Sequence, residues 1–119
     1  MSIEPERRVF KILSARDWDL AQSLGHSQTG LDEGDGYVHL STRDQVAETL
    51  RLHYAGQAKT RLLEYDLDGL GPNMKWEESR GGQLFPHLYD RLKIGLARRV
   101  WQLALGRDGT PELPADIDA

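Results

Sequence analysis

The chain has 119 residues, the length of one domain, and its 39% hydrophobic and 29% charged residues are typical of a globular protein. Its net charge is −4, and one arginine against four acidic residues after position 106 supplies −3 of it, so the nearly neutral body argues against binding of long nucleic acid. The absence of cysteine excludes disulfides, thiolate nucleophiles and cysteine-ligated metals. No apolar run approaches 18 residues and no signal-like segment opens the chain, so we expect a cytoplasmic protein that does not contact membranes.

The first half of the chain predicts the order β-α-β-α. An apolar-rich run predicts a strand over 8–13, and helical spacing predicts a helix over 15–24. Residues 25–36 contain four glycines and read as a loop, which by composition is suited to act as a lid. Clean alternation predicts a short strand over 37–41, and Thr42 is placed to cap the second helix.

The second half predicts strands only. We expect a strand over 60–67 and a long final strand over 92–105, separated by a segment, 74–91, that is dense in polar and aromatic residues. This order predicts an α+β fold in which two N-terminal helices pack on a small, mostly antiparallel sheet. The expected organisation is a single domain over 1–106 and a flexible acidic tail over 107–119.

One alternating segment groups side chains that suit a ligand. In a strand over 37–41, Tyr37, His39 and Ser41 face one side, opposite the apolar Val38 and Leu40. An aromatic ring, an imidazole and a hydroxyl on one face form a usable binding surface. The alternative is an ordinary solvent-facing strand side, because a lone histidine is usually structural or exposed.

A second segment repeats the pattern. If residues 84–89 are extended, Phe85, His87 and Tyr89 face one side, and Pro86 makes this an edge or irregular strand. The repeat favours a site to which both segments contribute. The two remaining histidines need no such role, since one lies in a polar loop and the other near the end of a helix.

Between the two segments lie further candidate ligand groups. Arg80 precedes the pair Gly81–Gly82, which allows close backbone approach, and a guanidinium can bind phosphate or carboxylate with two hydrogen bonds. Trp76 is either a base-stacking ring or a core aromatic. Glu77 is either a site carboxylate or the partner of Arg80 in a surface ion pair.

Three stretches carry a family resemblance. VFKILSARDWDLAQSLG, DGYVHLSTRDQVAET and KWEESRGGQLFPHLYDRL resemble the bacterial domain-of-unknown-function family numbered 952, over about Val9 to Val100. The resemblance implies an ADP-ribosyltransferase-like fold, with a split and mostly antiparallel sheet around a cleft that holds NAD in active relatives. YVHLST is also similar to the HVHLS stretch of the RNA 2′-phosphotransferases, which share this fold.

The resemblance transfers only in part to the site. Lys11 stands where the fold usually has a histidine on the adenosine ribose, whereas His39 and Ser41 match the phosphotransferase pattern. The stretch 84–89, where classical members carry a glutamate, has no carboxylate, and the nearest preceding acids are Glu77 and Glu78. The phosphotransferases also lack that glutamate, so its absence leaves activity open.

The main hypothesis is a cleft for an ADP-ribose-containing or similar anionic small ligand, with NAD as the possible cofactor, no metal, and a non-classical transferase as the possible activity. The residues assigned to it are His39, His87 and Glu77 for catalysis, and Lys11, Ser41, Trp76, Arg80, Phe85 and Tyr89 for binding.

Three alternatives stay open. The same cleft suits a binding module without catalysis. His39 and Ser41 match one His-x-Ser/Thr motif of the phosphoesterases that act on cyclic phosphates, whereas His87 and Tyr89 do not complete the second. His39, His87 and Glu77 are also a residue set that suits zinc.

Overall fold

The computed structural model describes residues 7–119, so the start of the predicted 1–106 domain lies outside the described residues. Its helices and 3₁₀ turns are α1 (Ala15–Leu24), α2 (Gly30–Asp35), α3 (Val46–His53), η2 (Leu67–Leu70), η3 (Arg80–Gly82) and η4 (Ile94–Leu96). Its strands are β1 (Arg8–Leu13), β2 (Val38–His39), β3 (Ser41–Thr42), β4 (Arg61–Asp66), β5 (Met74–Glu78), β6 (Leu84–Leu88) and β7 (Arg99–Gln102). No helix within these residues is long and apolar enough to cross a membrane.

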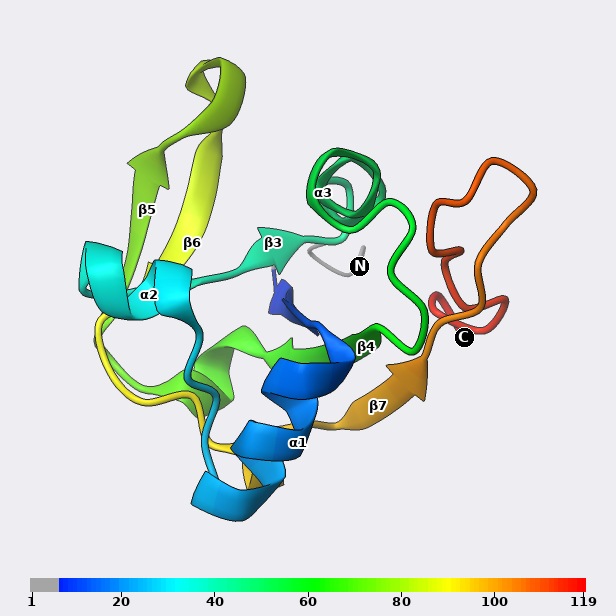
Figure 1. The fold of residues 1–119 in the computed structure, drawn as a ribbon. Coiled ribbons are helices and arrows are strands. Elements are labelled where there is room, and N and C mark those ends of the chain that lie inside the picture. Colours follow the sequence, from blue (N-terminus) through cyan, green and yellow to red (C-terminus); the bar gives the residue numbers. More distant parts are fainter. Residues whose placement is uncertain (1–6) are drawn as a thin grey trace.

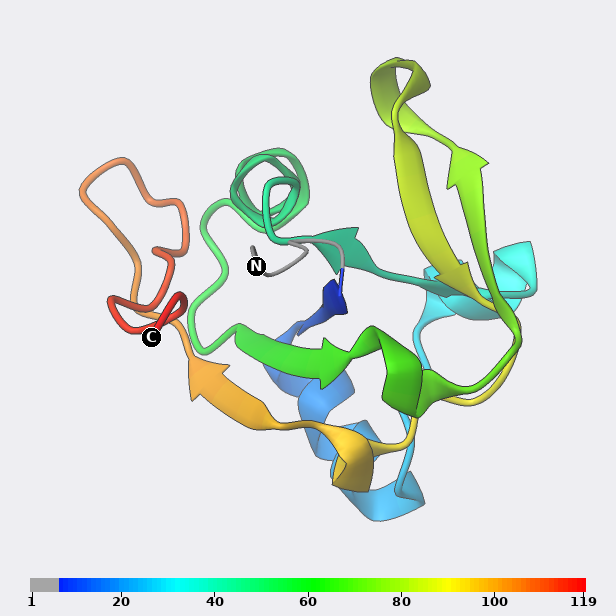
Figure 2. The same ribbon diagram turned by 180° about the vertical axis from the view of Figure 1, so that it is seen from behind.

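The strands form two antiparallel sheets, which confirms the predicted α+β class. The first has the order β3-β1-β4-β7 and the second the order β2-β6-β5. The β5–β6 hairpin rises from the body with η3 at its tip, and α2 lies beside its base (Figures 1 and 2). Because β2 belongs to the second sheet and β3 to the first, the short segment between these two strands joins the sheets.

The predicted strand over 37–41 is divided between the two sheets. Val38 and His39 pair with β6, whereas Ser41 and Thr42 pair with β1. Leu40 lies between them, and its N–H donates to the Pro86 carbonyl at 3.1 Å before the chain crosses over. The alternation read from the sequence survives this division, because each part remains extended.

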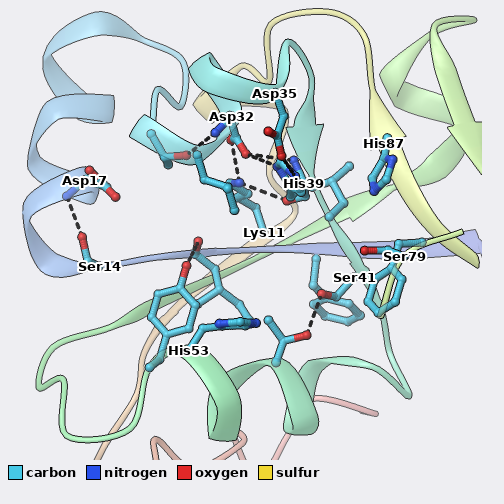
Figure 3. A pocket seen from close by; sticks show the side chains of 18 of the residues that line it. Lys11, Ser14, Asp17, Asp32, Asp35, His39, Ser41, His53, Ser79 and His87 are labelled. Atoms are coloured by element: carbon cyan, nitrogen blue, oxygen red, sulfur yellow. Dashed lines mark hydrogen bonds and ion pairs between the residues drawn. The ribbon is translucent and has the colours of Figure 1, made fainter. Parts of the chain in front are cut away.

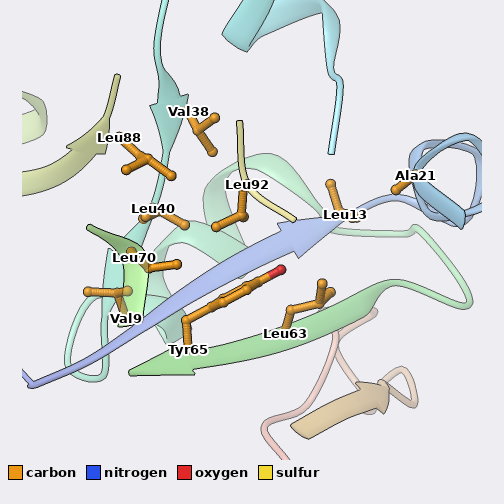
Figure 4. Close-up of a cluster of buried hydrophobic side chains, with 10 residues drawn as sticks. All are labelled: Val9, Leu13, Ala21, Val38, Leu40, Leu63, Tyr65, Leu70, Leu88 and Leu92. Atoms are coloured by element: carbon orange, nitrogen blue, oxygen red, sulfur yellow. The ribbon is translucent and has the colours of Figure 1, made fainter. Parts of the chain in front are cut away.

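The first sheet is buried on both faces. Val9, Leu13 and Tyr65 join a cluster that also contains Val38 and Leu88 from the second sheet (Figure 4). The residues of opposite phase form a second cluster with α3, the segment after β7 and the chain end: Phe10, Ile12, Val46, Leu50, Leu62, Leu103 and Ile117. Period-two alternation on β1 and β4 thus supplies both clusters.

Thr42 does not cap the second predicted helix, because α3 begins at Val46 after Gln45, whose side chain instead accepts the Thr42 N–H at 3.0 Å. Two predictions about whole elements were also wrong. The predicted loop over 25–36 contains α2, because Thr29 caps the helix through the Asp32 N–H at 3.1 Å and Gly36 ends it at a φ of 82°. This makes three α-helices in the described residues, not two. The predicted final strand over 92–105 is reduced to β7, because η4 turns the chain before it and only Arg99–Gln102 pair with β4.

The predicted acidic tail packs against the body in this structure. Ile117 is 3% exposed within the second apolar cluster. Asp118 accepts two hydrogen bonds from Arg43 and one from Arg8. These contacts tie the chain end to β1 and to the turn before α3; the flexibility expected for residues 107–119 stays a prediction.

Candidate functional site

A cavity of about 660 Å³ lies between α2, β1, α3 and the β6 side of the hairpin (Figure 3). Its volume is in the range of small-molecule sites. Six of the nine residues assigned to the site from the sequence line it: Lys11, His39, Ser41, Arg80, Phe85 and His87. Residues from four separate parts of the chain therefore meet here.

Lys11 and His39 are held in the wall by Asp32 of α2. The Lys11 ammonium, which is buried, donates to Asp32 Oδ2 at 2.8 Å and to the His39 carbonyl at 3.0 Å. Asp32 Oδ1 accepts the His39 backbone N–H at 3.1 Å and His39 Nδ1 at 2.6 Å. One carboxylate therefore fixes both the lysine and the orientation of the imidazole.

Burial and pairing act in opposite directions on this ion pair. Burial alone raises the pKa of Asp32, but hydrogen bonds from His39 and the charge of Lys11 outweigh it and leave the pKa below its ordinary value. Burial lowers the pKa of Lys11, and the charge of Asp32 opposes this without cancelling it. Asp32 is thus an ionised acceptor that requires a proton on His39 Nδ1.

The second nitrogen of His39 faces another acid of α2. His39 Nε2 lies 2.9 Å from Asp35 Oδ2, on a carboxylate whose side chain is 44% exposed. Both ring nitrogens of His39 thus face a carboxylate oxygen, and an ionised carboxylate only accepts hydrogen bonds. The helix that the sequence presented as a loop thereby supplies two groups to the site.

His87 is held by a second carboxylate. Its Nδ1 lies 2.8 Å from Glu77 Oε1, which also accepts the Tyr89 hydroxyl at 2.7 Å. The pKa of Glu77 is lowered by these two hydrogen bonds, most by the one from Tyr89. The hydrogen bond between Tyr89 and Glu77 in turn raises the pKa of Tyr89 to about 12. Glu77 therefore positions His87 from the rim and does not itself line the cavity.

The two histidines are cross-strand neighbours. His39 and His87 are register partners on β2 and β6, and their ring centroids lie 5.4 Å apart. Tyr37 stacks on His87 at 4.1 Å and tilts against His39 at 4.6 Å. The two aromatic–histidine segments identified in the sequence thus share one face of one sheet.

Arg80 lies where the hairpin meets α3. Its guanidinium is 4.9 Å from the Phe85 ring centroid and 3.4 Å from the Thr49 hydroxyl. Within residues 7–119 its partners are thus a ring and a hydroxyl, and no ion pair includes it. The expected surface pair of Arg80 with Glu77 does not form, because Glu77 is bound by His87 and Tyr89.

Two of the predicted aromatic contacts lie elsewhere. Trp76 is on the face of β5 opposite Glu77, where 37% of it is exposed. Tyr89 lies past the end of β6 and lines a second cavity of about 480 Å³ instead. Phe85 is the one predicted stacking ring that reaches the main cavity.

Sequence reasoning missed Asp32 and Asp35. The only local signal was Thr29 three residues before Asp32, a spacing typical of a capped helix start, inside a glycine-rich stretch. It also left Thr49 and Tyr54 of the α3 side unassigned, although both line the cavity. Burial raises the pKa of Tyr54 to about 12.

The donors present define what the cavity can do. Arg80 and the remaining N–H of Lys11 can bind oxyanions or hydroxyls, and two carboxylate-bound imidazoles can exchange protons. No three histidine, aspartate or glutamate side chains in the described part of the chain converge as metal ligands do, so the zinc alternative gains no support from them.

The fold and site define an α+β protein in which two antiparallel sheets meet beside a cavity with histidine, lysine and arginine side chains in its wall. A family model described as "Protein of unknown function (DUF952)" matches residues 12–100, and the chain belongs to this family, as its sequence motifs predicted.

Solved structures of one other protein resemble this chain closely. The crystal structure of protein CC0527 from Caulobacter crescentus is 40% identical in sequence, with a TM-score of 0.83 over 88% of this chain and 93% of that one. The solution NMR structure of CC0527 gives a TM-score of 0.78 at 40% identity, over 89% and 92% of the two chains. No curated protein matches this chain.

Proposed function

We propose that the cavity binds an ADP-ribose-containing nucleotide, with NAD as the first candidate, in a chain of the ADP-ribosyltransferase-like fold. The observation that carries this proposal is Arg80, a guanidinium in the cavity wall whose partners within residues 7–119 are uncharged. A phosphate supplies the charged, two-oxygen partner that a guanidinium binds best. Two antiparallel sheets beside one cavity agree with the fold that the sequence motifs imply.

Other wall residues have chemistry that suits the rest of such a ligand. An ammonium has three N–H donors, and Asp32 and the His39 carbonyl take two of those on Lys11, so one is left for a ribose hydroxyl. Phe85 offers an apolar ring under Arg80, and Thr49, which lies 3.4 Å from the hydroxyl of the buried Ser41, offers a hydroxyl. The volume of about 660 Å³ lies within the range that nucleotide-sized ligands occupy.

The residues of the cavity support binding of the nucleotide more directly than transfer of its ADP-ribose group. No carboxylate lies in 84–89, and Glu77 stays at the rim with His87 and Tyr89. A transferase releases free nicotinamide from NAD, whereas a binding module returns the dinucleotide intact.

Titration calorimetry with NAD tests the proposal through matched arginine variants. Arg80→Gln removes the proposed phosphate contact, and we expect the dissociation constant to rise about 10- to 100-fold, the usual worth of a hydrogen bond to a charged group. Arg51→Gln is the control, because Arg51 pairs with Glu48 on the exposed side of α3 and does not line the cavity. Equal loss in both variants, or no binding to the parent protein at millimolar NAD, would refute the proposal.

Chromatography of the calorimeter contents then distinguishes the two activities. Free nicotinamide that accumulates with the parent protein, and not with Arg80→Gln, supports a transferase or hydrolase. Quantitative recovery of intact NAD supports the non-catalytic binding module.

A further inference from the structure

His39 and His87 have the same kind of hydrogen bond at Nδ1 but different surroundings at Nε2. Each presents Nδ1 to its own carboxylate, at 2.6 Å for His39 with Asp32 and 2.8 Å for His87 with Glu77. Such a bond at Nδ1 fixes the orientation of each ring. Two oriented imidazoles 5.4 Å apart, as ring centroids, are close enough to serve one substrate group.

The outer nitrogens differ in their partners. His39 Nε2 faces Asp35 Oδ2 at 2.9 Å, so each nitrogen of this ring has a carboxylate acceptor, and the protonated ring can give one proton away. His87 lines the same cavity, and its Nε2 has no hydrogen-bond partner within residues 7–119. With a proton on Nδ1, toward Glu77, the neutral His87 ring presents a lone pair at Nε2. The pair therefore contains one donor and one acceptor.

The surroundings favour a phosphate between these two rings. Arg80 of η3 and the hydroxyls of Ser79 and Thr49 line the wall on the hairpin and α3 side of the cavity, the same wall to which His87 contributes. The chain has no cysteine, and within residues 7–119 no serine or threonine hydroxyl is hydrogen-bonded to a histidine ring that could activate it, so water is the fitting attacking group. A five-membered cyclic phosphodiester is strained, and its opening by water needs only an acid and a base.

We infer that His87 and His39 act as general base and general acid in the hydrolysis of nucleoside 2′,3′-cyclic phosphates. This deepens the proposed function and rests on it, because the cavity must first hold a nucleotide phosphate. His87 Nε2 takes a proton from water as the water oxygen bonds to phosphorus. One ring P–O bond breaks, and the departing ribose oxygen takes the proton from His39 Nε2. The product is a 2′- or 3′-nucleotide, and transfer of one proton from His87 to His39 through solvent restores the pair.

Glu77 and Asp32 are positioning residues in this reaction. Glu77 lies at the exposed rim, so its replacement disturbs little packing, whereas Asp32 also neutralises Lys11. Glu77→Gln should lower kcat about tenfold or more and leave KM nearly unchanged, since it acts through the ring of His87. A purely structural role would instead change thermal stability without this split between kcat and KM.

The experiment follows adenosine 2′,3′-cyclic monophosphate by phosphorus NMR with the parent protein and asparagine variants. His39→Asn and His87→Asn keep an amide N–H at the position of Nδ1 and remove Nε2, so each should lose about 10²- to 10⁴-fold in rate. His26→Asn is the matched control, because His26 lies outside this cavity and bonds its neighbour's carbonyl, and it should keep the full rate. Glu77→Gln tests the reaction independently if an asparagine variant fails to fold.

Binding of adenosine 3′-monophosphate and of NAD, measured in parallel, separates the two proposals. Binding of NAD without hydrolysis of the cyclic phosphate overturns this inference and leaves the proposed function intact. Binding of adenosine 3′-monophosphate alone, with no hydrolysis and no binding of NAD, overturns both. Hydrolysis that persists in both asparagine variants also overturns it. A parent protein that binds neither nucleotide and hydrolyses nothing removes both proposals together.

Discussion

Two carboxylates are buried among residues 7–119, Glu64 on β4 and Asp32 on α2, and each binds two nitrogen-bearing side chains. Glu64 pairs with Arg8 and Arg99, which also donate to the carbonyls of Asp116 and Ile117 and, from Arg8, to the Asp118 carboxylate. Asp32 pairs with Lys11 and His39, which line a cavity. The arginine donors of the first cluster bind the chain end, whereas in the second cluster Lys11 has only two hydrogen-bond acceptors within residues 7–119 for its three N–H groups.

This difference separates a structural ion cluster from a candidate functional one. Burial of charge is common to both and by itself indicates neither stability nor activity. Unused hydrogen-bonding capacity beside a cavity distinguishes the Asp32 cluster. The comparison predicts that mutations at Glu64 change folding alone, while mutations around Asp32 change folding and ligand chemistry together.

The largest effect on stability should come from Glu64→Gln. Loss of the charge leaves Arg8 and Arg99 facing each other beneath the chain end, and breaking such a buried pair costs about 3–5 kcal/mol. Urea unfolding measures the free energy of unfolding, and NAD titration of the folded variant should give an unchanged dissociation constant. A loss below about 1 kcal/mol, or a weakened NAD affinity, would break the comparison.

Asp32→Asn should lower the free energy of unfolding by less than Glu64→Gln does. It should also abolish the proposed hydrolysis of cyclic phosphate. Burial already lowers the pKa of Lys11, so this lysine can lose its proton when its partner is neutralised, and we expect a loss of about 2–3 kcal/mol. The double variant with Lys11→Met should recover most of that loss in urea unfolding, because no buried charge remains. A double variant less stable than Asp32→Asn alone contradicts this account of the pair.

Ionisation of the Tyr54 hydroxyl in the cavity wall should lower the free energy of unfolding at alkaline pH. Burial raises its pKa from 10.0 to about 12, so its contribution is complete below pH 10 and is lost as the pH rises towards 12. The slope from this one group is about 1.4 kcal/mol per pH unit. Tyr54→Phe should flatten the decline of unfolding free energy between pH 10 and 12. An unchanged slope in the variant would show that Tyr54 does not cause it.

The smallest effect should come from Asp66→Asn. Asp66 and Arg98 form a 3.1 Å pair in which both side chains are more than half exposed. Exposed pairs contribute about 0–1 kcal/mol, and salt screens them. Asp66→Asn therefore serves as the baseline for Glu64→Gln two residues earlier on the same strand, in the same urea titrations. A loss as large as that of Glu64→Gln would mean that burial does not set the cost.

The parts of the site that the sequence predicts are those set by local periodicity. Alternation placed Tyr37 with His39 and Phe85 with His87 on common faces, and the structure has them so. The pairing of β2 with β6 joins segments 48 positions apart, as in the register of His39 with His87, and no local pattern encodes such a register. The sequence therefore predicts each half of the site but not their contact.

Asp32 shows why the sequence alone does not predict the remaining parts of the site. Its stretch has four glycines and an acidic run, which favour a loop, and only the Thr29 cap and the buried Lys11 make a short helix favourable there. The chain end is a similar case. Its composition predicts a loose tail, yet Ile117 enters a core formed by β1, β4 and α3, a contact that depends on tertiary packing.

The most direct test of the central claim is an NMR titration of isotope-labelled protein with NAD. If only the Asp32 cluster is functional, amide shifts should move at Lys11, His39, Arg80 and His87 and stay fixed at Glu64 and Arg99. Shifts centred on Glu64 and the chain end, or no shifts at millimolar NAD, would contradict the claim that unused donors beside the cavity mark the ligand site.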